Sequence, residues 1–233
     1  MAKPARDARS GFAITYETSL LTLITFTISI ATLVWQIVNY LEGPQVKLIT
    51  PAQITIAPSG LVQFPNRDGG PFVHFIADMG YVNEASAGYN ATIRTERLRI
   101  TVAGAPTFEY AWYYTVVSDA GGPQGLSLVV TKKAPSHPLP LPAGSSQSHE
   151  TLFQPWLKDC SAVAAPCKPD DNYVDWKTFV GWFQKTGVIN FEFMLDVFGR
   201  DEPLSEKCTV RMSPAELAIF VQRGWGSPFC TSE

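Results

Sequence analysis

Four cysteines are the residues whose type and spacing predict a definite chemistry in this chain. The sequence places them at Cys160, Cys167, Cys208 and Cys230. An even number of cysteines in an oxidising compartment is typical of disulfides, and four allow three pairings. The shortest loops favour Cys160 with Cys167 and Cys208 with Cys230. A zinc site is the alternative, but neither pair has C-x₂-C spacing and no histidine follows His149.

The three histidines do not predict a metal site. His74 lies in an apolar stretch without a second ligand at strand spacing, which indicates a surface or hydrogen-bonded histidine. His137 and His149 flank a proline-rich segment and would meet only across a turn. A blue-copper site needs a histidine after Cys208, and the sequence has none there. We therefore predict neither a metal ion nor a bound cofactor.

One acidic run resembles the opening of a calcium-binding loop but departs from it at two positions. Asp170-Asp171-Asn172 is followed by Asp175 where the loop needs glycine, and by Gly181 where it needs glutamate. Asp and Asn are also common at helix N-termini, where their side chains accept hydrogen bonds from backbone N–H groups. We prefer the helix-cap interpretation.

A row of aromatic residues is the candidate binding surface. Tyr110, Trp112 and Tyr114 alternate along one face of a predicted strand, with Phe108 before them. The favoured interpretation is a buried core face. The alternative is an exposed surface for a protein or a sugar, because tyrosine and tryptophan are enriched where such partners dock.

Catalytic motifs are missing from the sequence. It has no Gly-x-Ser-x-Gly, no glycine-rich phosphate loop and no His-Glu-x-x-His. Beyond residue 43 there are 15 basic and 18 acidic residues, which argues against a nucleic-acid partner. We predict that the protein is not an enzyme. A hydrolase site assembled from residues distant in sequence is the remaining catalytic alternative.

The first element that positions these residues is an apolar run. Thr18 to Leu41 contains no charged residue. About 24 helical residues at ~1.5 Å each span roughly 36 Å, which exceeds a hydrocarbon core of about 30 Å. Pro44 ends the predicted helix. A cleaved signal peptide is the rival interpretation, but it would have a shorter apolar region and a small-x-small site, which does not follow Leu41.

The basic residues around this run predict its orientation. Lys3, Arg6 and Arg9 precede it, and only Lys47 follows closely. The positive-inside rule then places the N-terminus in the cytoplasm. We predict a single-pass protein of a cytoplasmic (inner) membrane whose C-terminal part is periplasmic or extracellular.

A polar stripe follows the apolar run at alternating spacings of three and four residues. This heptad spacing keeps one face aligned along a neighbouring helix, and in lipid such side chains tend to face another helix. The alternative is that the hydroxyl groups bond back to the carbonyl four residues earlier. We predict a membrane-protein partner, or self-association, through Thr18, Thr22, Thr25, Ser29, Thr32, Gln36 and Asn39.

The rest of the sequence predicts a mainly β fold. Short alternating stretches separated by turns fill residues 45–133, and further strands are predicted at Gln147–Phe153 and Val188–Phe198. A helix is predicted over 171–185, and Ser213-Pro214-Ala215-Glu216 is a capping box that begins a C-terminal helix.

These elements predict three parts of the chain. Residues 1–17 form a cytoplasmic tail and 18–41 a transmembrane helix. Residues 44–233 form an extracytoplasmic immunoglobulin-like β-sandwich with a small helical insertion at about 155–187. Two small domains meeting near residue 145 are the alternative.

The function that follows from this organisation is that of a non-catalytic accessory or scaffold subunit in a membrane protein complex. Its expected partners are the lipid bilayer and an integral membrane protein or a second copy of the chain. The alternative is an anchored receptor for a peptide or a glycan that uses the aromatic surface.

Overall fold

The computed structural model describes residues 16–60, 72–85, 88–121, 127–155, 157–158, 168–169 and 173–232. Two compact units divide the chain, residues 1–43 and residues 44–233. Several residues of the sequence predictions lie outside the described residues, namely Cys160, Cys167, Asp170, Asp171 and Asn172.

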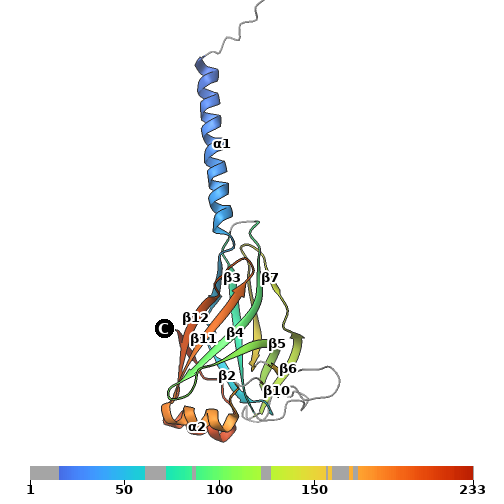
Figure 1. The fold of residues 1–233 in the computed structure, drawn as a ribbon, viewed down its shortest axis with the longest axis vertical. Helices are drawn as coiled ribbons and strands as arrows, with labels where there is room; N and C mark the ends of the chain where they lie inside the picture. The colour runs from blue at the N-terminus through green and yellow to red at the C-terminus, as the bar shows by residue number, and fades with distance from the viewer. Residues whose placement is uncertain are drawn as a thin grey trace, which may run out of the picture. The chain divides into compact units, whose positions relative to one another are not determined.

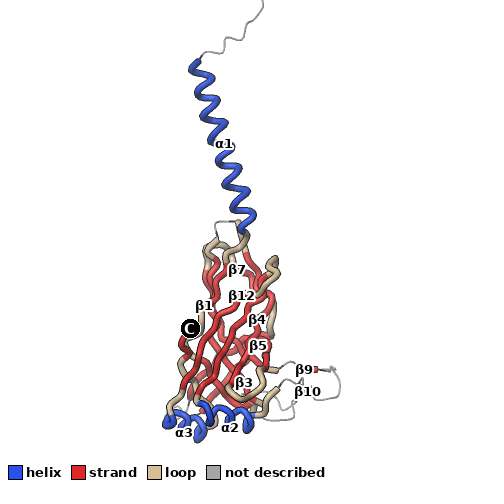
Figure 2. Tube along the Cα trace, turned by 60° about the vertical axis from the view of Figure 1, so that its left-hand side comes forward, coloured by secondary structure: helices blue, strands red, loops and turns tan. Residues whose placement is uncertain are grey.

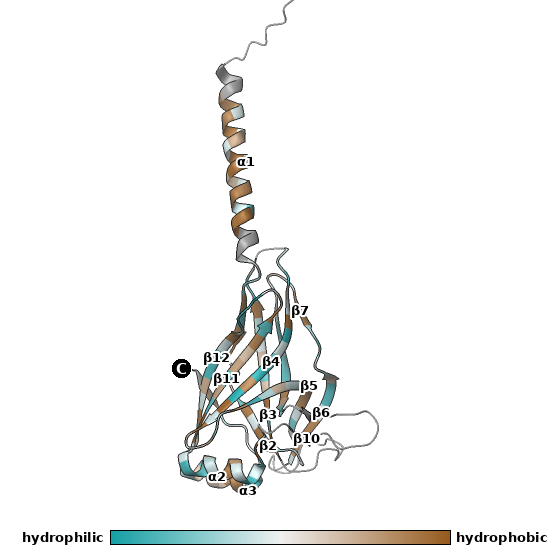
Figure 3. Cartoon of the chain, viewed as in Figure 1, coloured by the Kyte–Doolittle hydropathy of each residue, from teal (hydrophilic) through white to brown (hydrophobic). Residues whose placement is uncertain are grey.

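In the first unit the described residues form the helix α1 (Tyr16–Glu42). Its segment Leu20–Val38 is long and apolar enough to cross a membrane, and none of it is buried within the chain (Figure 3). Apolar side chains that the protein leaves uncovered need another apolar environment. The helix predicted over residues 18–41 is confirmed, since α1 covers these residues. A signal sequence near the N-terminus would pass the same test of length and composition.

The second unit is mainly β, and its described residues include two helices. Its strands are β1 (Val46–Ile49), β2 (Ile54–Pro58), β3 (Val73–Asn83), β4 (Ala91–Val102), β5 (Phe108–Gly121), β6 (Ser127–Pro135), β7 (Leu139–Leu141), β8 (Ser146–Gln154), β9 (Leu157–Lys158), β10 (Lys168–Pro169), β11 (Val188–Val197), β12 (Leu204–Arg211) and β13 (Cys230–Ser232). Its helices are α2 (Trp176–Thr186) and α3 (Pro214–Arg223).

Eleven of these strands form one antiparallel sheet. The strand order is β1-β3-β8-β5-β4-β11-β12-β13, with β2 beside β3, β6 beside β5 and β7 beside β4. The sheet curls on itself, as Figures 1 and 2 show. Strands β9 and β10 form a separate pair. Because β8 pairs with both β3 and β5, the sheet continues across residue 145, where the alternative placed a domain boundary.

Hydrogen bonds join the two ends of the curled sheet. The Ile54 N–H donates to the Pro228 carbonyl at 3.1 Å, and Ile56 and Gly226 exchange two backbone bonds of 2.8 and 3.1 Å. The N–H of Cys230 donates to the carbonyl of Ala52 at 2.9 Å. The segment before β13 therefore lies beside β2, so strands surround the interior.

The interior is filled by alternate side chains of the strands. On β11 the predicted inward row is confirmed, since it is buried at Ile189, Phe191, Phe193, Leu195 and Val197. Aromatic rings from different elements meet at the centre: Phe75 lies 5.5 Å from Phe191 and 5.7 Å from Phe179, measured between ring centroids. Edge-on aromatic pairs of this kind add stability beyond their buried area.

Both helices have the N-terminal caps that the sequence predicts. The Ser213 hydroxyl accepts from the Glu216 N–H at 3.3 Å, and the Glu216 carboxylate accepts from the Ser213 N–H at 2.7 Å, which is the predicted capping box. The Asp175 carboxylate accepts from the Thr178 N–H at 2.9 Å. Asp175 is thus an N-cap of α2, as preferred over a calcium ligand.

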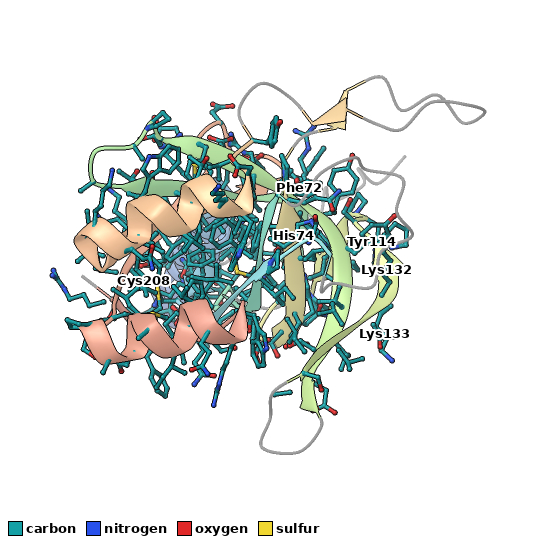
Figure 4. All side chains as sticks on the ribbon, turned by 90° about the horizontal axis from the view of Figure 1, so that it is seen from below. Phe72, His74, Tyr114, Lys132, Lys133 and Cys208 are labelled. Carbon is teal, nitrogen blue, oxygen red and sulfur yellow. A yellow bond between two sulfur atoms is a disulfide. The ribbon has the colours of Figure 1, made fainter. Side chains whose placement is uncertain are left out.

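The two helices lie across one end of the curled sheet (Figures 1 and 4). Helix α2 buries Phe179 and Phe183, and α3 buries Leu217 and Phe220. These four side chains belong to the same core cluster as the inward faces of the strands. The helical insertion and the C-terminal helix therefore close the core at this end.

The immunoglobulin-like sandwich of the sequence analysis is not confirmed. The fold is mainly β, but its main strands belong to a single curled sheet instead of two facing sheets. The physical reason lies in the period of a strand. Alternation of apolar and polar residues shows which side chains face a core, and it is the same in a sandwich and in a curled sheet.

Candidate functional site

A groove on the outer face of the sheet is the candidate binding site. Its volume is about 710 Å³, within the range of roughly 300–1,000 Å³ that ligand sites occupy. Strands β3 and β8 form its floor. One wall comes from β5 and β6, and the other from the β1–β2 connection and the segment before β13. The lining residues that matter below are Ile76, Asp78, Leu128, Glu150, Trp225 and Phe229.

The wall formed by β5 arises because this strand extends beyond the end of its pairing with β8. Strand β5 pairs with β8 as far as Val116, opposite Glu150, and pairs with β6 as far as Gly121. Ser118 then binds the Glu150 carboxylate with its N–H and its hydroxyl, at 2.6 Å each. These bonds fix the wall to the floor.

The opposite wall begins where β1 and β2 are interrupted. Both strands pair with β3, and residues 50–53 lie between them. Pro51 in this connection has no N–H to donate to a sheet. The interruption leaves Pro51 and its neighbours lining the groove, beside Ser227 and Phe229.

The floor of the groove carries two carboxylates. Asp78 on β3 is directly opposite Glu150 on β8. Like charges in this position destabilise a sheet, by up to about 1 kcal/mol. Among the described residues that line the groove, none is lysine, arginine or histidine. Within the described part of the chain the Asp78 side chain has no ion-pair or hydrogen-bond partner. The groove is therefore negatively charged.

One end of the groove is apolar. Ile76, Leu128 and Trp225 belong to a small hydrophobic cluster on the outer face of the sheet and are largely buried. Phe229, in contrast, is 72% exposed. An exposed phenyl ring in the lining of a groove gains stability when a partner covers it. The groove thus combines an apolar end with an acidic floor.

A second polar site lies inside the sheet, around a buried carboxylate. Glu96 on β4 is completely buried. Its Oε1 lies 3.0 Å from Nε2 of His149, and its Oε2 accepts a hydrogen bond of 2.7 Å from the Thr151 hydroxyl. Burial and the Glu96 charge raise the pKa of the Tyr81 hydroxyl far above its usual value. Tyr81 is therefore a neutral phenol at any physiological pH.

The surroundings of Glu96 decide its chemical role. The indole of Trp112 and the ring of His149 are 5.0 Å apart between centroids, and Tyr81 lies 5.6 Å from His149. A substrate does not reach a carboxylate that these rings and the core enclose. A buried acid of this kind needs its ion-pair and hydrogen-bond partners for stability. We interpret the cluster as a structural part of the core.

His74 is buried on the outer side of β3, and Figure 4 shows it with Phe72, Tyr114 and Lys132. It is 1% exposed, and its ring meets Phe72 edge-on at 4.8 Å between centroids. Burial, followed by the charge of Lys132, lowers the pKa of the imidazole to about 3. The ring is neutral at physiological pH. Among the described residues, no group of three His, Cys, Asp or Glu is arranged to hold a metal ion.

The predicted aromatic surface is divided between core and exterior. Tyr110 is fully buried and Trp112 is 3% exposed. Tyr114 is half-buried, with the Lys132 ammonium 4.1 Å from its ring centroid. A partner docking on this strand in the observed conformation would therefore contact Tyr114 but not the other two rings.

The polar stripe of α1 is largely satisfied within the helix. The hydroxyls of Thr25, Ser29 and Thr32 each donate to the carbonyl four residues earlier, at 2.8 Å. This is the alternative that the sequence analysis kept open. Gln36 is exposed, and an amide has more hydrogen-bonding groups than a hydroxyl. The side chains of Thr18 and Asn39 lie outside the described part.

One predicted cysteine pair is present. Cys208 and Cys230 are bonded, with 5.5 Å between their Cα atoms and 22 residues of sequence separation. The disulfide links β12 to β13, next to the segment that joins the sheet ends. The other predicted pair, Cys160 with Cys167, lies outside the described residues.

Sequence reasoning missed the groove and the Glu96 cluster. Asp78 and Glu150 are 72 residues apart in the printed sequence, and only the pairing of β3 with β8 brings them together. The sequence offers only a weak indication that Glu96 is buried, because polar and apolar residues are mixed on both faces of β4. Comparisons with protein-family models, curated proteins and solved structures gave no match. The function is therefore inferred from the residues of this chain.

Proposed function

We propose that this protein is a membrane-anchored extracytoplasmic accessory or scaffold subunit without catalytic activity. The observation that carries the proposal is α1, whose segment Leu20–Val38 is apolar and unburied within the chain. A lipid bilayer supplies the environment that such a segment needs. The unit that follows has a closed core and a groove suited to binding, with its most buried acid held in a structural cluster.

Two observations support placing the second unit outside the cytoplasm. Lys3, Arg6 and Arg9 precede α1, which favours a cytoplasmic N-terminus. The bonded pair Cys208 and Cys230 fits an oxidising compartment, since disulfides are rare where thiols are kept reduced. Both point to a periplasmic or extracellular second unit.

Alkaline extraction of native membranes tests the anchor. We expect the full-length chain to stay in the membrane pellet after a carbonate wash, because insertion of a predominantly apolar helical segment of 19 residues is effectively irreversible. Intact-mass analysis should find residues 1–43 still attached. A mature chain in the soluble fraction that begins after α1 would show a cleaved signal sequence and contradict the anchor.

The polar stripe supports a partner within the membrane through its amide side chains. Replacing Gln36 and Asn39 together by leucine is expected to reduce recovery of the co-purified membrane protein by about threefold or more, since interhelical hydrogen bonds contribute on the order of 0.6–1.7 kcal/mol. The measurement is quantitative mass spectrometry after purification in mild detergent. Ile37→Leu, between the two stripe positions, is the control. If the unmodified protein, the double variant and Ile37→Leu recover equal amounts of the membrane protein, the polar stripe does not bind that partner.

A second candidate function is an anchored binding module. The groove favours it, because it pairs an apolar end with an acidic floor over a volume of about 710 Å³. The two functions agree if the ligand of the groove is a segment of the partner protein.

A further inference from the structure

We propose that the groove binds an extended segment of a partner protein in which a lysine or arginine lies two residues from an apolar side chain. This inference rests on the proposed function, because it gives the chemistry by which an accessory subunit recognises its protein partner. The groove lies on the outer face of β3 and β8.

The charge of the groove selects a cation. Asp78 and Glu150 face each other across β3 and β8, and no basic residue is among the described residues that line the groove. Ser118 occupies two acceptor positions of Glu150, and a carboxylate has about four. Both acids therefore retain acceptor capacity. A guest ammonium or guanidinium would offset their mutual repulsion and form charge-assisted hydrogen bonds.

The spacing of the floor residues sets the spacing in the ligand. Ile76 and Asp78 are two positions apart on β3, so they point to the same face. Glu150 and Leu152 are related in the same way on β8. An extended segment lying along these strands places its own same-face side chains at the same interval. The apolar side chain then covers the accessible part of the apolar end, where Ile76, Leu128 and Trp225 line the groove, when the cation reaches the acids.

The same features disfavour the other occupants. A lipid phosphate or another anion would meet two carboxylates with no compensating cation in the described lining. A free polyamine would satisfy the acids but leave the apolar lining of the groove uncovered, including Phe229 at 72% exposure. A basic and apolar peptide segment meets both requirements.

Fluorescence anisotropy with the full-length protein in mild detergent tests the proposal. The probes are fluorescein-labelled Gly-Ser-Leu-Thr-Lys-Ser-Gly and its reverse-order form Gly-Ser-Lys-Thr-Leu-Ser-Gly. The control peptides replace the lysine by glutamate or the leucine by serine. We expect at least one probe to bind with a Kd below about 1 mM, and each control peptide to bind about tenfold more weakly.

Protein variants locate the binding. Asp78→Asn is expected to weaken the probe about tenfold, because it removes an exposed charge while keeping the side-chain shape. Phe229→Ala is expected to weaken it several-fold through lost apolar contact. Asp201→Asn, an exposed acid outside the groove, is the matched control and should bind as the unmodified protein does. Circular dichroism of each variant confirms folding.

Three results would overturn the inference. They are no binding of either probe below about 1 mM, equal binding of the lysine and glutamate peptides, and displacement by spermine as effective as displacement by unlabelled probe. These results can be distinguished from failure of the proposed function. If the chain co-purifies with a membrane protein but does not bind the probes, the accessory role stands and the groove inference fails. If the chain binds the probes but is found in the soluble fraction, the groove inference stands and the membrane anchor fails.

Discussion

Replacing His149 by alanine is expected to lower the free energy of unfolding by about 3 kcal/mol. Glu96 is completely buried, and His149 Nε2 lies 3.0 Å from its Oε1. Removing His149 leaves this buried carboxyl oxygen without a polar partner, which costs about 1–3 kcal/mol, and more when the group is charged. Glu96 is completely enclosed, so the upper end of that range applies. Urea unfolding followed by far-ultraviolet circular dichroism measures the change.

A double-mutant cycle separates the pair from general loss of packing. In a Glu96→Gln background, His149→Ala should cost at least about 1 kcal/mol less than in the unmodified protein, because no buried charge is left alone. His137→Ala is the matched control: this histidine is exposed, and its loss should change stability by no more than about 0.5 kcal/mol. Additive effects of the two core substitutions would contradict a direct interaction between His149 and Glu96.

Removing the disulfide is expected to have an effect of similar size. The combined variant Cys208→Ala with Cys230→Ser should lose roughly 3.5 kcal/mol of stability, which the chain-entropy relation gives for a loop of 22 residues. Alanine is used at Cys208 because that position is 1% exposed. A polar side chain there would add a burial penalty of its own.

Two measurements test the disulfide prediction. Urea unfolding of the variant and of the unmodified protein gives the stability difference, and non-reducing peptide mapping shows whether Cys208 and Cys230 are linked. An unfolding midpoint within error of the unmodified protein would show that the bond contributes nothing. A map linking Cys208 to Cys160 or Cys167 would replace the proposed connectivity.

Elements with local causes were predictable from the sequence. The alternation from Ile189 to Val197 predicts a strand with one buried face, and the structure has it. Ser213 and Glu216 predict the start of α3 because a capping box needs only residues three positions apart. Each signal lies within a single element, so it can be recognised without knowledge of the fold.

Features that depend on strand register were not predictable. The Thr55 and Ser227 hydroxyls lie 2.7 Å apart although 172 residues separate them in sequence. Asp78 and Glu150 become neighbours only through the pairing of β3 with β8. Period-two alternation is the same for every register that keeps one face inward. For the same reason the sequence could predict a mainly β fold but not one curled sheet, and could not predict the groove.

The joining of β2 to the segment before β13 has a consequence for how the protein is made. Ile54 and Ile56 pair with Pro228 and Gly226, which lie far later in the chain. Until that later segment has been synthesised and has left the ribosome, β2 has an open edge on that side, and unpaired strand edges are sites of aggregation. This edge of the sheet therefore closes late in synthesis, and the nascent chain needs protection until then.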